Sequence, residues 1–210
     1  MGNFIARDVE ENLDAVTNRM IDCGAHKADI LPGLEKLAEA GLKVLQSQAR
    51  YEGGYWNTTG IARPVTVEVI LDQMKTRNLN VLFHGATGRG NDQVRFELGY
   101  HYFGPKIKII APWRIWNLKS RTDLINYAKK HGIPIPKDKK GAPPFSVDDN
   151  LFHTSTEGKV LENPKNSAPE FIFQRTISPE KAPNKPTFVS INFKKSDPVG
   201  INGKKLSTSK

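Results

Sequence analysis

The first 136 residues alternate between apolar residues at helical spacing and short apolar runs of strand length. Steps of three and four residues predict amphipathic helices through Val9 to Met20 and over residues 34–48, 64–77, 93–102 and 122–131. Compact apolar runs predict strands at residues 29–31, 81–83 and 107–110. This alternation is typical of an α/β domain, in which a parallel sheet carries helices on both faces, as in Rossmann-like proteins.

The pattern changes near residue 136. Ile133–Pro136 contains two prolines and leads into a lysine-rich run, which predicts a linker or a domain edge. Beyond it, apolar periodicity is weak until Phe188–Phe193, whose alternation predicts a strand, and residues 203–210 predict a disordered polar tail. We therefore expect an α/β domain over residues 1–136, followed over residues 137–210 by the start of a second, α+β domain.

The stretch Asn80–Glu97 combines the 81–83 strand, which we expect to be buried, with a Gly-rich loop and the start of a helix. Glycine permits open turns and close approach of the backbone to a ligand, and Asn91 or Asp92 can cap the helix. Free N–H groups at a helix start favour anions, so the natural occupant of this loop is a phosphate or a carboxylate.

Neither common nucleotide motif fits this loop. A GxxxxGK[ST] motif needs Lys and Ser or Thr where Asn91 and Asp92 stand, and GxGxxG fails because Gln93 takes its last position. A plain turn remains the simplest alternative. The loop nevertheless holds more donors and charges than a turn requires, namely His84, Thr87, Arg89, Asn91, Asp92 and Arg95.

The segment Tyr51–Pro64 is a second polar stretch with aromatic residues. It contains two tyrosines, a tryptophan and several small polar residues before a helix that Pro64 can begin. Aromatic residues packed under a loop explain this pattern without a ligand, and we prefer that explanation for Trp56.

Composition narrows the functional classes. The 210 residues are 38% hydrophobic, and no apolar run is long enough to span a membrane. The acidic residues near the start do not fit a targeting peptide. We therefore expect a cytoplasmic protein. The single Cys23 excludes an intrachain disulfide and a cysteine-based metal cluster. The net charge of +9 is spread over small lysine clusters, so charge alone keeps a nucleic-acid-associating protein open, with strongly salt-dependent affinity as its sign.

The stretch HGATGRGNDQVRFEL, residues 84–98, closely resembles a long and specific motif of the argininosuccinate synthases. Similar matches follow at APWR (111–114), YAKKHGIPIP (127–136), DDNLFHTSTEG (148–158) and LENPKN (161–166). The resemblance implies an ATP-dependent ligase of arginine biosynthesis and the urea cycle that joins citrulline to aspartate and releases AMP and pyrophosphate. In that family the citrulline ureido oxygen attacks the α-phosphorus, and the aspartate amine then displaces AMP.

The resemblance also implies site residues. It assigns Gly85, Thr87 and Asp148 to ATP, Thr87, Asn91 and Asp92 to aspartate, and Tyr55, Asn91, Arg95, Ser146 and Ser155 to citrulline. It implies no catalytic residue and no protein metal site, because such chemistry rests on positioning and charge stabilisation, with Mg²⁺ held by phosphates and waters. Gly60 departs from members that carry a hydroxyl side chain there, and His84 and His153 are expected to be hydrogen-bonded structural residues.

The sequence lacks the SGG-type pyrophosphate loop with which the family begins, and the family's long C-terminal part. We therefore expect an internal segment of such an enzyme, inactive alone and a homotetramer when full length, with small-molecule substrates and no nucleic-acid or membrane partner. A noncatalytic nucleotide- or amino-acid-binding remnant is the alternative. Titration with each substrate separately would reveal binding without turnover.

Overall fold

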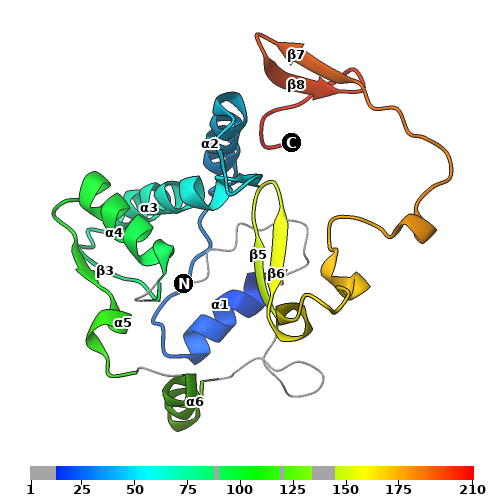
Figure 1. Cartoon of the computed structure of the whole chain (residues 1–210). Helices are drawn as coiled ribbons and strands as arrows, with labels where there is room; N and C mark the ends of the chain where they lie inside the picture. Colours follow the sequence, from blue (N-terminus) through cyan, green and yellow to red (C-terminus); the bar gives the residue numbers. More distant parts are fainter. Residues whose placement is uncertain (1–12, 88–89, 119–120, 134–144) are drawn as a thin grey trace. The chain divides into compact units, whose positions relative to one another are not determined.

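The computed structural model (Figure 1) describes residues 13–87, 90–118, 121–133 and 145–210. These residues fall into two compact units. The first contains the described residues up to Ala40 and from Thr59 to Ile133, and the second contains Gly41–Thr58 together with those from Phe145 onward. The predicted linker at 134–141 lies outside the described residues.

The first unit is mainly helical around a pair of parallel strands. Its elements are α1 (Leu13–Asp22), α3 (Thr58–Thr76), β3 (Val81–Phe83), α4 (Asn91–Phe103), β4 (Lys108–Ile110), α5 (Pro112–Ile115) and α6 (Arg121–Lys130). Helix α2 (Leu34–Ser47) crosses the division between the units. The predicted strand at residues 29–31 is absent: the structure assigns these residues no regular secondary structure, and the Asp29 side chain pairs with Arg77 at 2.7 Å.

Strands β3 and β4 pair in parallel, with Leu82 opposite Ile109, and α4 connects them. The predicted parallel strand–helix–strand order is therefore confirmed. Both carboxyl ends lie at one edge of this pair, where the loop after β3 begins. The His84 N–H extends the pairing by donating to the Ile110 carbonyl at 3.2 Å.

The core of the first unit forms between α3, α4 and the strands. Its buried members are Val67, Met74, Leu82 and Tyr100, with Ile70, Leu71, Phe96, Ile107 and Ile109 packed around them. The helical spacing of α3 produces this face, as the sequence predicted. A Cβ added to Gly99 in α4 would meet the Val67 side chain at 3.1 Å, so glycine permits the close packing of the two helices.

The prediction of a fully buried strand at 81–83 is wrong. Only Leu82 is buried, whereas Val81 and Phe83 are 48% and 53% exposed. Successive strand side chains point to opposite faces, and α3 and α4 cover only the face that carries Leu82. On the other face Phe83 contacts Trp116, with 6.4 Å between ring centroids.

Pro64 does not begin its helix as predicted. Helix α3 starts at Thr58, so Pro64 lies inside it, where it cannot donate the usual N–H to the preceding turn. The residues before it are also more ordered than a loop, because β1 (Arg50–Tyr51) and β2 (Tyr55–Trp56) form a small antiparallel hairpin.

The second unit contains small antiparallel sheets and short 3₁₀ turns. Besides β1 and β2 it comprises the hairpin β5 (Ser146–Asp149) and β6 (Thr154–Glu157), the 3₁₀ turns η1 (Lys159–Glu162), η2 (Glu170–Ile172) and η3 (Pro179–Lys181), and the sheet β7 (Ile191–Lys194), β8 (Asp197–Ile201) and β9 (Lys204–Lys205). Strand β7 begins later than the 188–193 segment predicted. Lys204 and Lys205 pair with β8, so the predicted disordered tail is in part a strand.

Candidate functional site

The Gly-rich loop lies at the carboxyl end of β3. The Gly90 N–H donates to the Thr87 carbonyl at 3.2 Å, and Thr87 is exposed. A Cβ added to Gly85 would meet no atom within 4 Å, so open space lies beside this backbone. Gly88 and Arg89 lie outside the described residues. The loop therefore leaves the Gly85 backbone accessible for close approach of a ligand.

The prediction that Asn91 or Asp92 caps α4 is wrong. Gly90 is the N-cap residue, with no side-chain hydrogen bond, and Asn91 and Asp92 lie in the first helical turn. Asn91 is exposed. A carboxylate in the first turn is stabilised by the free N–H groups there, so Asp92 keeps a favourable position without acting as a cap.

Asp92 lies between two arginines. Its Oδ2 accepts a hydrogen bond from Arg63 at 2.6 Å, and its Oδ1 accepts one from Arg95 at 3.1 Å. Burial raises the pKa of this carboxyl, but the two arginines outweigh that effect and lower the pKa below its usual value. Asp92 is therefore held as a carboxylate with partners that a bound substrate could share or replace.

Beside Asp92 lies a cavity of about 440 Å³. Its lining residues are Arg63, Ile70, Leu82, Phe83, His84, Gly85, Ala86, Asp92, Phe96 and Tyr100. Of the predicted site residues in this unit, Gly85 and Asp92 line it, whereas Thr87, Asn91 and Arg95 do not. Aromatic side chains form one part of the wall and a charged pair another, an arrangement suited to a small polar ligand.

Arg63 is a site residue that the sequence analysis missed. It lines the cavity, pairs with Asp92, and has its guanidinium carbon 5.9 Å from the Phe96 ring centre. In the sequence, the only indication of this role was a single arginine in the polar segment before Pro64. Its partner is 29 positions away, so helical spacing could not reveal the pair.

His84 forms a hydrogen bond with the loop that follows it. Its Nδ1 accepts the Ala86 N–H at 3.3 Å, and its Nε2 lies 3.7 Å from a carboxylate oxygen of Glu97. Glu97 also accepts hydrogen bonds from Gln93 and, at 2.8 Å, from Arg114. Burial lowers the pKa of His84, and nearby Glu97 opposes this only in part. These contacts fit the structural role that the sequence analysis gave to His84.

The hairpin β5–β6 carries the other predicted residues. Ser146 pairs with Glu157 and Asp148 pairs with Ser155 in an antiparallel register. Directly opposite residues, and residues two apart on one strand, share a face of the sheet. Ser146, Asp148 and Ser155 therefore lie on one face, which we call the serine face. Ser146 is the first residue of β5.

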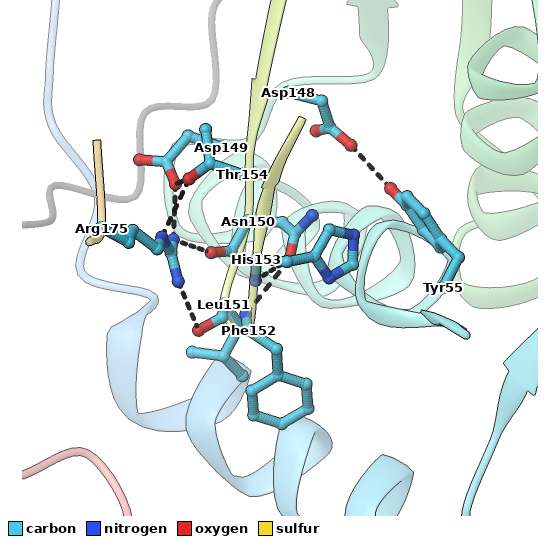
Figure 2. Close-up of polar contacts among 9 residues, drawn as sticks. All are labelled: Tyr55, Asp148, Asp149, Asn150, Leu151, Phe152, His153, Thr154 and Arg175. Carbon is cyan, nitrogen blue, oxygen red and sulfur yellow. Dashed lines mark hydrogen bonds and ion pairs between the residues drawn. The ribbon is translucent and has the colours of Figure 1, made fainter. Parts of the chain in front are cut away.

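Tyr55 meets the serine face through Asp148 (Figure 2). The Tyr55 hydroxyl donates to Asp148 Oδ2 at 2.6 Å. The Tyr55 ring also lies edge-on to His153, with 4.2 Å between ring centroids, and close to Tyr51. A residue assigned to citrulline thus contacts one assigned to ATP, so the hairpin and Tyr55 form a single polar surface.

An Asn side chain fixes the turn between β5 and β6. Asn150 Oδ1 accepts the backbone N–H groups of Phe152 and His153, both at 3.1 Å (Figure 2). Such a side chain replaces a backbone acceptor in a tight turn. A Cβ added to Gly41 would overlap the Leu151 side chain, so glycine lets this turn pack against α2.

The described residues include no group of three or more His, Cys, Asp or Glu side chains that could hold a metal ion. None of the described helices is long and apolar enough to cross a membrane. The two groups of side chains offer complementary chemistry: an anion held between arginines in one unit, and hydroxyl groups beside a carboxylate in the other.

A loop at the carboxyl end of a parallel strand, opening into a helix with an acidic first turn, is the arrangement at which α/β domains of the Rossmann-like class bind ligands. A family model for the arginosuccinate synthase N-terminal HUP domain matches residues 5–134, and one for the arginosuccinate synthase C-terminal domain matches residues 145–210. The chain belongs to the argininosuccinate synthase family. The predicted fold class is thereby confirmed.

Curated relatives carry the same family name. An argininosuccinate synthase of Pelagibacter ubique is 69% identical over 164 residues, which are 78% of this chain and 42% of that protein. One of Mesorhizobium japonicum is 52% identical over 173 residues, which are 82% of this chain and 42% of that protein. The chain thus spans less than half the length of these relatives.

Proposed function

We propose that this chain forms part of an argininosuccinate synthase, an ATP-dependent ligase that joins citrulline to aspartate and releases AMP and pyrophosphate in arginine biosynthesis. The observation that carries the proposal is Asp92 held between two arginines at the start of α4, within the motif that the family resemblance rests on. An ionised carboxylate flanked by guanidinium groups suits a substrate with both an ammonium and carboxylates.

The aspartate site in this proposal contains Thr87, Asn91 and Asp92. Asp92 accepts a hydrogen bond from the ammonium group of the substrate aspartate. The Thr87 hydroxyl and the Asn91 amide donate hydrogen bonds to the substrate's carboxylates. The lowered pKa of Asp92 supports this role, because an ammonium needs an ionised partner. Arg63 competes with the substrate for Asp92 and sets the carboxylate's orientation.

The citrulline site contains Tyr55, Asn91, Arg95, Ser146 and Ser155. Arg95 pairs with the citrulline carboxylate, and the hydroxyl groups hold its other polar atoms. The shared face of Ser146 and Ser155 supports this assignment.

ATP contacts Gly85 and Thr87 in the loop, and Asp148 in the hairpin. The open space beside Gly85 supports the first of these contacts. ATP enters as its Mg²⁺ complex, with the metal held by phosphates and waters. No side chain acts as nucleophile; the protein positions the substrates and stabilises charge as citrulline attacks the α-phosphorus.

The proposal extends to the organisation of the protein. Residues 1–136 form the nucleotide-binding domain, and residues 137–210 begin the domain that completes the substrate site. The full-length enzyme is a cytoplasmic homotetramer. Gel filtration with light scattering, applied to a full-length protein that contains this chain, tests the assembly.

The test of activity uses the chain and an extended protein, in which the chain is joined at both ends to the corresponding segments of the Pelagibacter ubique relative. Release of AMP and pyrophosphate is measured with citrulline, aspartate and Mg²⁺-ATP. We expect sustained release of both AMP and pyrophosphate by the extended protein only when all three are present, because pyrophosphate leaves when citrulline attacks ATP and AMP leaves only when aspartate reacts. Binding of single substrates without any release would favour the alternative, a noncatalytic binding remnant. Failure to bind any substrate would contradict both.

A further inference from the structure

Arg175 contacts the β5–β6 hairpin from a segment that follows η2 (Figure 2). Its Nη2 donates to Asp149 Oδ1 at 2.5 Å, and its Nε donates to Thr154 Oγ1 at 2.9 Å. The same guanidinium donates to the backbone carbonyls of Asn150 and Leu151 in the turn. One side chain thus bridges the end of β5, the turn and the start of β6.

The contacts with Arg175 form a closed ring with the hairpin. The Thr154 hydroxyl accepts from Arg175 and donates to Asp149 Oδ1 at 2.6 Å. Asp149 and Thr154 are also directly opposite each other in the strand register. The guanidinium therefore fixes the last cross-strand pair before the turn, and a planar fork with several donors suits this role better than an ammonium.

The ring lies on the face of the hairpin opposite the serine face. Asp149 comes directly after Asp148 in β5, and Thr154 comes directly before Ser155 in β6. Successive strand residues point to opposite faces, so Asp149 and Thr154 lie on the other face. Figure 2 shows Arg175 with Asp149 and Thr154 on one side, and Tyr55 with Asp148 on the other. Arg175 can therefore fix the serine face without contacting a ligand bound there.

We propose that Arg175 is a positioning residue that holds the register and turn of the β5–β6 hairpin, and thereby places Asp148 and Ser155 for substrate. The second half of this inference rests on the proposed function, in which the serine face binds citrulline. The first half concerns the hairpin alone. A two-stranded hairpin is marginally stable without outside support, and Arg175 supplies that support across both strands.

The first experiment measures amide hydrogen exchange in the whole chain and in Arg175→Ala and Arg175→Lys. We expect the Phe152 and His153 amides to exchange about tenfold faster in Arg175→Ala than in the wild type, because loss of charge-assisted bonds favours local opening. The increase in exchange rate should be smaller in Arg175→Lys. Lys181→Ala is the control: it removes a nearby cation whose 2.8 Å pair with Glu170 is well exposed. Circular dichroism verifies that each variant remains folded.

The second experiment compares the extended protein with its Arg175→Ala and Arg175→Lys variants. Calorimetry measures citrulline binding, and steady-state kinetics measures kcat and KM. We expect Arg175→Ala to raise the citrulline dissociation constant and KM about tenfold with little change in the KM for aspartate. Arg175→Lys should recover part of the loss. A uniform fall in all parameters, as from a poorly folded protein, would contradict the positioning role.

The two experiments separate the inference from the proposed function. Unchanged exchange in Arg175→Ala overturns the inference, whatever the activity. Faster exchange with unchanged citrulline binding overturns the link to the serine face. A wild-type chain and extended protein that do not bind citrulline contradict the proposed function, while the exchange data still decide whether Arg175 holds the hairpin.

Discussion

The Gly-rich loop and the β5–β6 hairpin hold their polar groups in different ways. At the loop, Asp92 is ionised and balanced by Arg63 and Arg95, so charge pairing sets its position. At the hairpin, strand register places Asp148 opposite Ser155, and the neutral Tyr55 hydroxyl completes the arrangement. We therefore expect the loss of a charged residue assigned to a substrate at the loop to have a larger effect than the loss of a single hydroxyl group at the hairpin.

Asp92→Ala tests the charged site and carries the largest expected effect. It removes the acceptor proposed for the substrate ammonium and leaves two arginines without their partner. The loss of charge-assisted bonds should cost about 1.5–3 kcal/mol, which raises the aspartate KM of the extended protein by roughly tenfold to a hundredfold. Steady-state kinetics with aspartate varied measures it.

The matched control for Asp92→Ala is Asp72→Ala. Asp72 pairs with Lys36 at 3.1 Å, but its side chain is 65% exposed, so its removal should leave the aspartate KM unchanged. Equal effects of the two substitutions, or an unchanged KM in Asp92→Ala, would remove Asp92 from the aspartate site.

The loop was predictable from sequence because its chemistry is contiguous. Residues 84–98 hold the glycines, Asp92 and Arg95 in one stretch, and residues three apart in a helix are neighbours, as the 3.1 Å contact between Arg95 and Asp92 shows. The 29-residue separation of Arg63 from Asp92 hid that pair, because it depends on how α3 packs against α4. Tertiary packing also explains why only Leu82 of β3 is buried.

The hairpin was less predictable. Its residues 146–157 show no apolar alternation, so the strand register that gathers Ser146, Asp148 and Ser155 left no signal in the hydrophobic pattern. Family resemblance identified those residues but assigned Asp148 and Tyr55 to different substrates. Their hydrogen bond depends on a separation of 93 positions, which no local pattern encodes.

Arg95→Lys separates charge from geometry at the loop. Lysine preserves the positive charge beside Asp92 but loses the planar two-pronged donor proposed to hold the citrulline carboxylate. We expect kcat/KM for citrulline in the extended protein to fall about tenfold.

Arg77→Lys is the control for Arg95→Lys, because Arg77 forms a comparable ion pair, with Asp29 at 2.7 Å, and is assigned to no substrate. Wild-type kcat/KM in Arg95→Lys would reassign Arg95 to a purely structural role beside Asp92.

Tyr55→Phe tests the hairpin by removing one neutral hydroxyl. Loss of the 2.6 Å bond to Asp148 should weaken citrulline binding by about 0.5–1.5 kcal/mol, a smaller effect than at the loop because Asp148 itself and the serine hydroxyls remain in place. Calorimetric titration with citrulline measures it. Tyr51→Phe, which keeps the ring contact with Tyr55 but removes the hydroxyl of an exposed tyrosine, is the control. A larger effect than that of Asp92→Ala on aspartate would reverse the comparison between the two sites.

The smallest expected effect is the pH dependence that His84 gives to the loop. Its imidazole faces Glu97 of α4 and, beyond that carboxylate, Arg114 of α5. Burial lowers the pKa of His84, so the unfolded state binds its proton more readily than the folded state does. The stabilisation is therefore present above the unfolded pKa of about 6.5 and is lost as pH falls below it. The pKa values of Asp92 and Glu97 are also lowered, which adds losses of the same sign in more acidic solution.

The free energy of unfolding, measured with denaturant between pH 8 and 5, tests this assignment. His84→Asn places a carbonyl oxygen near Nδ1, so the Ala86 N–H keeps an acceptor while the titrating group is removed. We expect a shallower pH dependence in this variant, most clearly between pH 7 and 5.5. His26→Asn removes an exposed imidazole and is the control. If His84→Asn and wild type lose stability in parallel as pH falls, the acid sensitivity of the chain arises from its carboxylates, and His84 supports the loop only through its hydrogen bond.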